Sequence, residues 1–185
     1  MRDDIAQWAR ETARAQLEGP LPRRWAHTQG VARQARTLAP LVGDDAGVLE
    51  AAAWLHDIGY APALTATGFH PLDGARYLRD VHSLDAWLCR LVAHHTCALL
   101  EARERGLDDV LVAEFGAEPP ALFEPLLYCD MTTSPDGEQL PVEQRIAEIQ
   151  ARYGPGHLVS RFITAASPTL VEAVNRVEGA LRPVR

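Results

Sequence analysis

The 185-residue sequence contains no lysine, and all eighteen of its basic residues are arginine. A lysine nucleophile or lysine Schiff base is therefore excluded, and any basic side chain that contacts a phosphate must be a guanidinium. The net charge is −7 at pH 7, and no basic block or basic stripe interleaved with aromatic residues is present. This charge pattern argues against binding to duplex or single-stranded nucleic acid.

Cysteines and long apolar runs are also scarce. Cys89, Cys97 and Cys129 are odd in number and form no C-x-x-C pair, which argues against a disulfide framework or a thiolate zinc site. The longest apolar runs fall far short of the roughly 20 residues that cross a membrane. The stretch MRDDIAQWARETARAQ lacks the apolar core of a signal peptide. We therefore expect a cytoplasmic protein with no membrane partner.

The sequence has almost no period-two alternation, whereas apolar residues recur at three- and four-residue spacing nearly everywhere. This pattern predicts an all-α fold, a single helical bundle of about eight to ten helices separated by glycine and proline breakers. The expected helices include residues 83–106, with Ser83 as the N-cap, and Thr169 to Leu181 after a break at Ser167-Pro168. The length suits one domain over residues 1–185, with the C-terminal helices peripheral.

Several histidines fall on the apolar faces of the predicted helices. In PRRWAHTQGVARQARTLAPL, His27 shares a stripe with Val31, and His56 lies seven residues after Leu49 at the last turn of the next helix. Asp57 follows directly. Both histidines are therefore expected to face the core, with a carboxylate beside the second.

Further polar side chains point inward from later helices. His70 opens a helix of its own, and His94 and His95 border the apolar seam of the helix over residues 83–106. The helix PALFEPLLYCDMTT directs Asp130 toward the core, where an unpaired carboxylate is costly, so we expect it to meet a cation.

Together these imidazoles and carboxylates predict a metal site. A lone histidine on an apolar face is more often a hydrogen-bonded core residue than a ligand, but five inward histidines with inward carboxylates favour a metal. Mixed nitrogen and oxygen ligands suit Fe, Mn, Co, Ni or Zn better than Mg²⁺ or Ca²⁺. His82 and His157 lie in the loop-like stretches DVHSLD and GPGHLV, where capping or solvation is expected.

The order of these residues resembles the HD superfamily of metal-dependent phosphohydrolases, whose fold is an all-α bundle. The likeness covers about residues 23–153 and rests on four positions: His27, His56, Asp57 and Asp130. The additional histidines are similar to those of a subgroup with an H…HD…H…H…D ligand set that holds two metals: His70, His94 and His95.

The resemblance implies a role for each of these residues. The first metal would be held by His27, His56, Asp57 and Asp130, with Asp57 and His56 forming the catalytic centre. Asp57 would bridge to a second metal held by His70 together with His94 or His95, a choice that the sequence leaves open. Two metals about 3.5 to 4 Å apart would lower the pKa of a shared water and neutralise phosphate oxygens.

The resemblance also implies a small phosphorylated substrate, a nucleotide or another phosphate monoester or diester. Arg23 and Arg24, one turn before His27, and Arg145 in PVEQRIAEI are candidate phosphate contacts, and Thr96 could orient water or a ligand. The G-Y-P signature of cyclic-di-GMP phosphodiesterases and the ED pair of ppGpp hydrolases are missing. The sequence is more similar to bacterial six-ligand HD proteins of dinucleoside-polyphosphate hydrolase type, in which a His-Thr pair like His95-Thr96 occurs.

Two other functions stay open at this point. Some enzymes that resemble the six-ligand arrangement hold a di-iron pair and act as oxygenases, and a non-enzymatic, metal-stabilised regulatory module is a further alternative. The sequence leaves the metal, the substrate and the oligomeric state undetermined.

Overall fold

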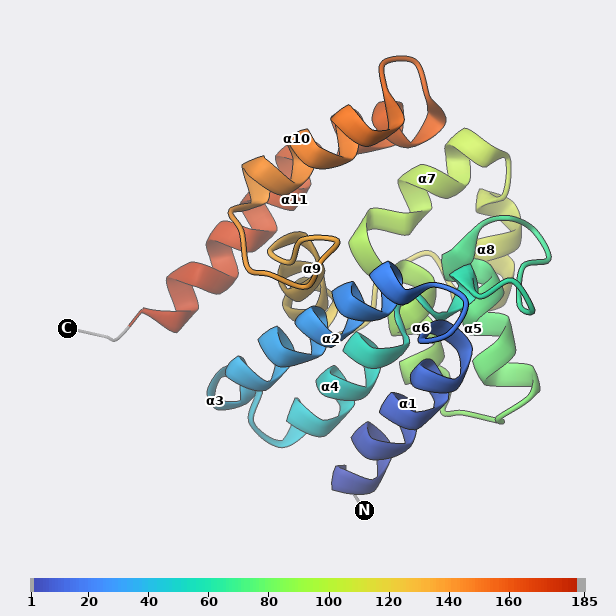
Figure 1. Cartoon of the computed structure of the whole chain (residues 1–185), viewed down its shortest axis with the longest axis vertical. Helices are drawn as coiled ribbons and strands as arrows, with labels where there is room; N and C mark the ends of the chain where they lie inside the picture. The colour runs from blue at the N-terminus through green and yellow to red at the C-terminus, as the bar shows by residue number, and fades with distance from the viewer. Residues whose placement is uncertain (1, 183–185) are drawn as a thin grey trace.

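The computed structural model describes residues 2–182 and is built from helices (Figure 1). Over this range there are ten α-helices of eight or more residues, one four-residue helix and three 3-10 helices. Their bounds are α1 (Arg2–Leu17), α2 (Pro22–Thr37), α3 (Ala39–Val42), η1 (Gly43–Asp45), α4 (Ala46–Leu55), η2 (Ile58–Tyr60), α5 (His70–Asp80), α6 (Ala86–His94), η3 (His95–Cys97), α7 (Ala98–Arg105), α8 (Asp108–Phe115), α9 (Phe123–Met131), α10 (Val142–Tyr153) and α11 (Leu158–Leu181). The described residues contain no β-strand, so the predicted all-α fold is confirmed. Within this range no helix is long and apolar enough to cross a membrane.

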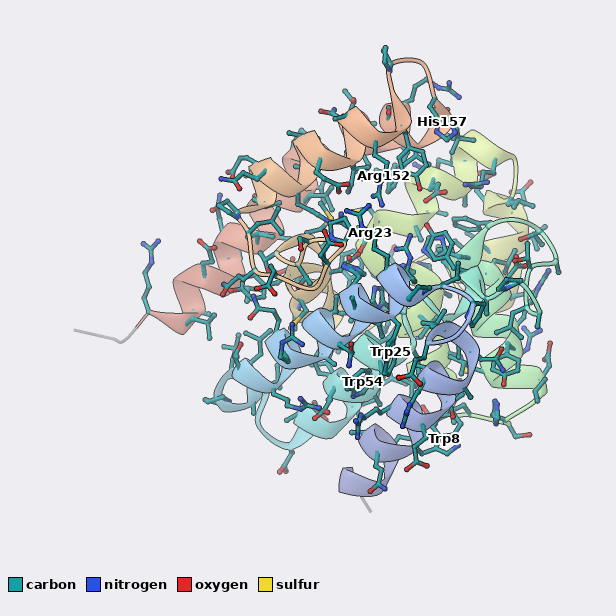
Figure 2. All side chains as sticks on the ribbon, in the orientation of Figure 1. Trp8, Arg23, Trp25, Trp54, Arg152 and His157 are labelled. Atoms are coloured by element: carbon teal, nitrogen blue, oxygen red, sulfur yellow. The ribbon has the colours of Figure 1, made fainter. Side chains whose placement is uncertain are left out.

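Helix α4 carries the His-Asp pair into the interior. It packs against α1 and α2, which lie on either side of it, and also contacts α9 (Figure 1). The alanines at 51–53 are fully buried, and such small side chains let neighbouring helices approach closely. Trp25 of α2 stacks on Trp54 of α4 with ring centroids 5.4 Å apart (Figure 2). The C-terminal end of α4 therefore lies deep in the bundle.

The prediction of a single helix over residues 83–106 is wrong, because the structure divides this segment into α6, η3 and α7. Ser83 does not cap it: the helix begins at Ala86, and the Asp85 side chain accepts a hydrogen bond from Trp87 N at 2.8 Å. The break falls at Thr96 and Cys97, which have φ values of 50° and 59°. Positive φ is costly for a β-branched residue, so tertiary contacts must hold this turn.

The prediction of a helix break at Ser167-Pro168 is also wrong, since α11 runs without interruption from Leu158 to Leu181. Pro168 is exposed, so its ring meets solvent rather than a neighbouring helix. The apolar stripe from Phe162 to Val177 stays buried on both sides of the proline, and packing of that stripe offsets the missing backbone donor. Helix α11 packs against α9 and α10 and also contacts η3 and α7.

Candidate metal centre

The predicted ligands come from separate helices and form two buried groups. His27, His56 and Asp130 make the first group, and Asp57, His70 and His95 make the second. Within each group the candidate ligand atoms all lie within 4.8 Å of one another. Five separate elements supply them: the middle of α2, the end of α4, the start of α5, the turn η3 and the end of α9.

Asp57 lies between the two groups. Its Oδ2 is 3.3 Å from His56 Nε2 and 3.7 Å from His27 Nε2. Its Oδ1 is 3.3 Å from His70 Nε2 and 3.9 Å from His95 Nε2. One carboxylate thus presents a different oxygen to each histidine pair, which is the arrangement that a bridging ligand needs.

Backbone contacts fix the orientation of three imidazoles. His27 Nδ1 lies 2.9 Å from Ser134 O, His56 Nδ1 2.8 Å from Ala53 O, and His95 Nδ1 2.6 Å from Val92 O. A carbonyl accepts a proton from the ring, so each neutral imidazole carries its proton on Nδ1 and a lone pair on Nε2. All three Nε2 lone pairs are therefore directed at the carboxylates, in the form that binds metals.

The residues fit a divalent cation because several of their polar atoms have no other suitable partner. His56 is fully buried, and its Nε2 makes no hydrogen bond to any described residue. His27 Nε2 lies 3.0 Å from Asp130 Oδ1, so two acceptor atoms face each other, and His70 Nε2 lies 3.1 Å from His95 Nε2. A cation placed between such acceptors satisfies them together.

The charge states also suit metal binding at neutral pH. Burial lowers the pKa of the His27 imidazole, and it lowers the pKa of the His95 imidazole to about 4, so both rings are neutral. Burial by itself would raise the pKa of the Asp57 carboxyl, but the Arg24 guanidinium and the neighbouring His56 bring it well below its usual range. Burial likewise lowers the pKa of the His70 imidazole, whereas burial of His56 is outweighed by the carboxylates of Asp57 and Asp130, which raise its pKa. The ionised Asp57 carboxylate therefore has the neutral imidazoles of His27, His70 and His95 and the more basic imidazole of His56 around it.

The structure separates the two neighbouring histidines that the sequence could not distinguish. His94 ends α6, and its Nε2 lies 3.4 Å from Phe115 O, away from both ligand groups. His95 follows in η3, and its ring joins His70 and Asp57. The left-handed turn at Thr96 and Cys97 comes directly after His95. The Thr96 hydroxyl donates a hydrogen bond to Asp130 Oδ2, which ties this strained turn to the first group.

The arginines predicted to contact phosphate lie in different surroundings. Arg24 donates from Nη1 to Asp57 Oδ2 at 2.6 Å, and its guanidinium lies over the Tyr60 ring at 4.0 Å. Arg145 is buried, with 4% of its surface exposed, whereas Arg23 is exposed and pairs with Asp136 at 2.8 Å. Arg24 and Arg145 therefore border the metal centre, whereas Arg23 lines a separate pocket together with His27 and Arg24.

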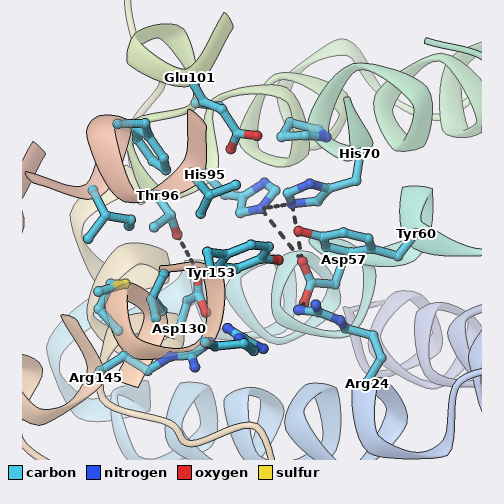
Figure 3. A pocket seen from close by; sticks show the side chains of 18 residues that line it. Arg24, Asp57, Tyr60, His70, His95, Thr96, Glu101, Asp130, Arg145 and Tyr153 are labelled. Atoms are coloured by element: carbon cyan, nitrogen blue, oxygen red, sulfur yellow. Dashed lines mark hydrogen bonds and ion pairs between the residues drawn. The ribbon is translucent and has the colours of Figure 1, made fainter. Parts of the chain in front are cut away.

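A pocket of about 570 Å³, including its open mouth, lies beside the two groups (Figure 3). Asp57, His70, His95 and Asp130 line it, together with the cationic side chains of Arg24, Arg145 and Arg152. Its apolar wall is formed in part by α11, which contributes Val159, Phe162 and Ile163. The ligand groups are thus accessible to a small molecule from one side.

Four polar residues of this pocket were missed in the sequence: Tyr60, Glu101, Arg152 and Tyr153. The Tyr60 ring stacks between Arg24 and His70, at 3.9 Å from the His70 ring, but no motif marks it. Glu101 has Arg105 one turn later, a spacing typical of a solvated helix face. The two histidines set aside do lie elsewhere: His82 packs between Trp8 and Tyr77, and His157 caps α11 by accepting from Val159 N.

Gly59 allows the close helix contact that places His70. A Cβ at this position would lie 2.1 Å from His70 O and 2.6 Å from Gly74 N. We expect Gly59→Ala to push the first turn of α5 outward, destabilising the fold by about 1 to 3 kcal/mol and lowering metal content at the His70 group. Urea unfolding and elemental analysis would measure the two effects. Gly19→Ala, where a Cβ meets nothing within 4 Å, is the control, and equal metal content in the two variants would contradict the prediction.

The fold and site define an all-α protein with a histidine and aspartate centre suited to divalent metal ions. The family model described as HD domain matches residues 24–150, which is more than half of the chain. The chain therefore belongs to the HD domain family, a group made up in general of metal-dependent hydrolases. Comparisons with the curated proteins and with the solved structures gave no match.

Proposed function

We propose that this protein is a metal-dependent phosphohydrolase that acts on a small phosphate ester. The observation that carries the proposal is the placement of Asp57 between two ligand groups, at the edge of a pocket that three arginines line. Two metal ions would be held by His27, His56 and Asp130 on one side and by His70 and His95 on the other. Asp57 would be shared between them.

The cations of the pocket support an anionic substrate. Glu148 is the acid that pairs with two of them, lying 2.5 Å from Arg145 Nη1 and 3.4 Å from Arg152 Nε. The Nε of Arg145 is buried and makes no hydrogen bond within the described part of the chain. A buried guanidinium with a free donor is costly, and a phosphate oxygen is well suited to accept from it.

The chemistry divides between the metal ions and the protein. When bound, two metals supply an activated water and neutralise the charge on the phosphate oxygens. The protein orients the ligands: Asp57 is held by Arg24, and Asp130 accepts from the Thr96 hydroxyl. Arg145 and Arg152 would bind the non-reacting phosphate oxygens. Arg24 would join them while it keeps the Asp57 carboxylate ionised.

The proposal is tested with protein loaded separately with Fe, Mn, Co, Ni or Zn and assayed on nucleotides and simple phosphate esters. We expect metal-dependent phosphate release that His56→Ala abolishes. We expect Arg145→Leu to raise KM by about 10- to 100-fold, the effect of losing charged hydrogen bonds. Arg161→Leu is the matched control, since Arg161 is exposed and pairs with Glu104 at 2.8 Å.

Two results would overturn the proposal. If the iron-loaded protein consumed oxygen in the presence of substrate and released no phosphate, the protein would be a di-iron oxygenase and not a phosphohydrolase. If the protein bound its full complement of metal but showed neither activity on any of the nucleotides and esters, it would be a non-catalytic module that the metal stabilises.

A further inference from the structure

The pocket has an acidic end as well as a basic one. Glu101 of α7 lines it, and only 6% of this residue is exposed. In the close view, Glu101 lies on the far side of His95 and His70 from Arg24 and Arg145, with its carboxylate turned into the pocket (Figure 3). A molecule that fills the pocket would therefore meet cations at one end and a carboxylate at the other.

One oxygen of this carboxylate is free to accept hydrogen bonds. Arg105 donates to Glu101 Oε1 from Nε at 2.8 Å and from Nη2 at 2.6 Å. None of the described residues donates to Oε2 in the structure. An ionised carboxylate can accept about four hydrogen bonds, so Oε2 keeps its capacity to accept from a bound molecule. The pocket thus contains a carboxylate oxygen with no donor among the described residues, within reach of a ligand.

The chemistry around Glu101 restricts what the ligand can present there. Apolar side chains of Pro71, Ala98 and Ile163 also line the pocket, and none of them can donate a hydrogen bond to Oε2. A second phosphate or a carboxylate would be repelled by Glu101. A methyl group would leave Oε2 buried and unpaired, whereas an amino or hydroxyl group would donate to it.

We propose that Glu101 selects phosphate esters whose organic part carries a hydrogen-bond donor, an amino or hydroxyl group. This inference rests on the phosphohydrolase function proposed above. One substrate would then occupy both ends of the pocket. The phosphate lies at the metal centre and the arginines, and the donor group lies at Glu101.

The test uses three esters of the same length: 4-aminobutyl phosphate, 4-hydroxybutyl phosphate and pentyl phosphate. For the metal-loaded wild type we expect kcat/KM at least about tenfold higher for the amino and hydroxyl esters than for pentyl phosphate, the effect of one charge-assisted hydrogen bond. Glu101→Met should remove both preferences by lowering the rates of the donor esters. Glu101→Gln, which keeps a neutral acceptor, should retain part of the preference for the hydroxyl ester.

A purely structural role for Glu101 gives a different result. If the carboxylate only holds Arg105, Arg105→Met and Glu101→Met should impair all three esters by the same factor, which would overturn the inference. We expect instead that Arg105→Met retains the preference, because the carboxylate remains.

The phosphonates of the same three chains separate this inference from the proposed function. Calorimetric binding of 4-aminobutylphosphonate at least about tenfold tighter than pentylphosphonate, lost in Glu101→Met, would support Glu101 even if no ester were hydrolysed. If the two phosphonates bound equally well and all three esters were hydrolysed, the proposed role of Glu101 in substrate selection would be overturned. The proposed phosphohydrolase function would still stand.

Discussion

Replacing Asp57 with alanine is expected to reduce the bound metal at both ligand groups and to lower phosphate release by at least about a thousandfold. Among the described residues, Asp57 is the carboxylate whose two oxygens face different histidine pairs, at 3.3 Å from His56 Nε2 and 3.3 Å from His70 Nε2. Its removal therefore weakens both sites at once. It also leaves the half-buried Arg24 guanidinium without the carboxylate that it contacts at 2.6 Å.

Elemental analysis of the purified variant, with the folded state checked by circular dichroism, measures this effect. Glu114→Gln is the matched control, because Glu114 also pairs with arginines, Arg76 and Arg79, but lies outside the pocket lining. The control should keep the metal content of the wild type. Asp57→Ala protein that still holds as much metal as the wild type would show that Asp57 does not bridge the two groups.

Helical periodicity was sufficient to predict most of the candidate ligands. His27 and His56 lie on apolar stripes of continuous helices, and Asp130 follows the buried Leu126 and Leu127 of α9. In each case the spacing along one regular helix determines which way the side chain points. These positions therefore follow from local structure, and the packing of α4 against α2 and α9 brings them together.

The same reasoning failed where the helix is not regular. Nothing in the stretch HHTCALL predicts left-handed residues at Thr96 and Cys97, because the residues that favour positive φ are glycine and asparagine. The turn depends on a contact remote in sequence, from the Thr96 hydroxyl to Asp130. Periodicity applied across the break placed both His94 and His95 beside the buried seam of one helix. In the structure, only His95 joins a ligand group.

The pocket residues show a second limit of sequence reasoning. Glu101 and Arg105 have the spacing of a surface ion pair, yet Glu101 is buried because α11 covers this part of α7. The α11 residues that line the pocket, Val159, Phe162 and Ile163, lie in the first turns of that helix, more than 50 residues away from Glu101 in the chain. Tertiary packing thus decided which of the charged helix residues face solvent and which face the pocket.

The two neighbouring histidines provide the sharpest comparison, because they differ by one position in the chain. His95→Ala is expected to lose the metal held with His70 and to lower phosphate release by about a hundredfold or more, since the ring at 3.1 Å from His70 Nε2 is removed. His94→Ala should keep the metal content of the wild type, because His94 Nε2 faces Phe115 O and neither ligand group.

Both rings are buried, so each alanine leaves a cavity and destabilises the fold by a similar mechanism. A loss of stability common to the two variants therefore cannot explain a difference in metal content between them. Metal per chain and phosphate release are measured on both proteins at a temperature where each is folded. If His94→Ala lost the metal and His95→Ala kept it, the ligand at this position would be His94, and the second group would have to rearrange around the turn at Thr96.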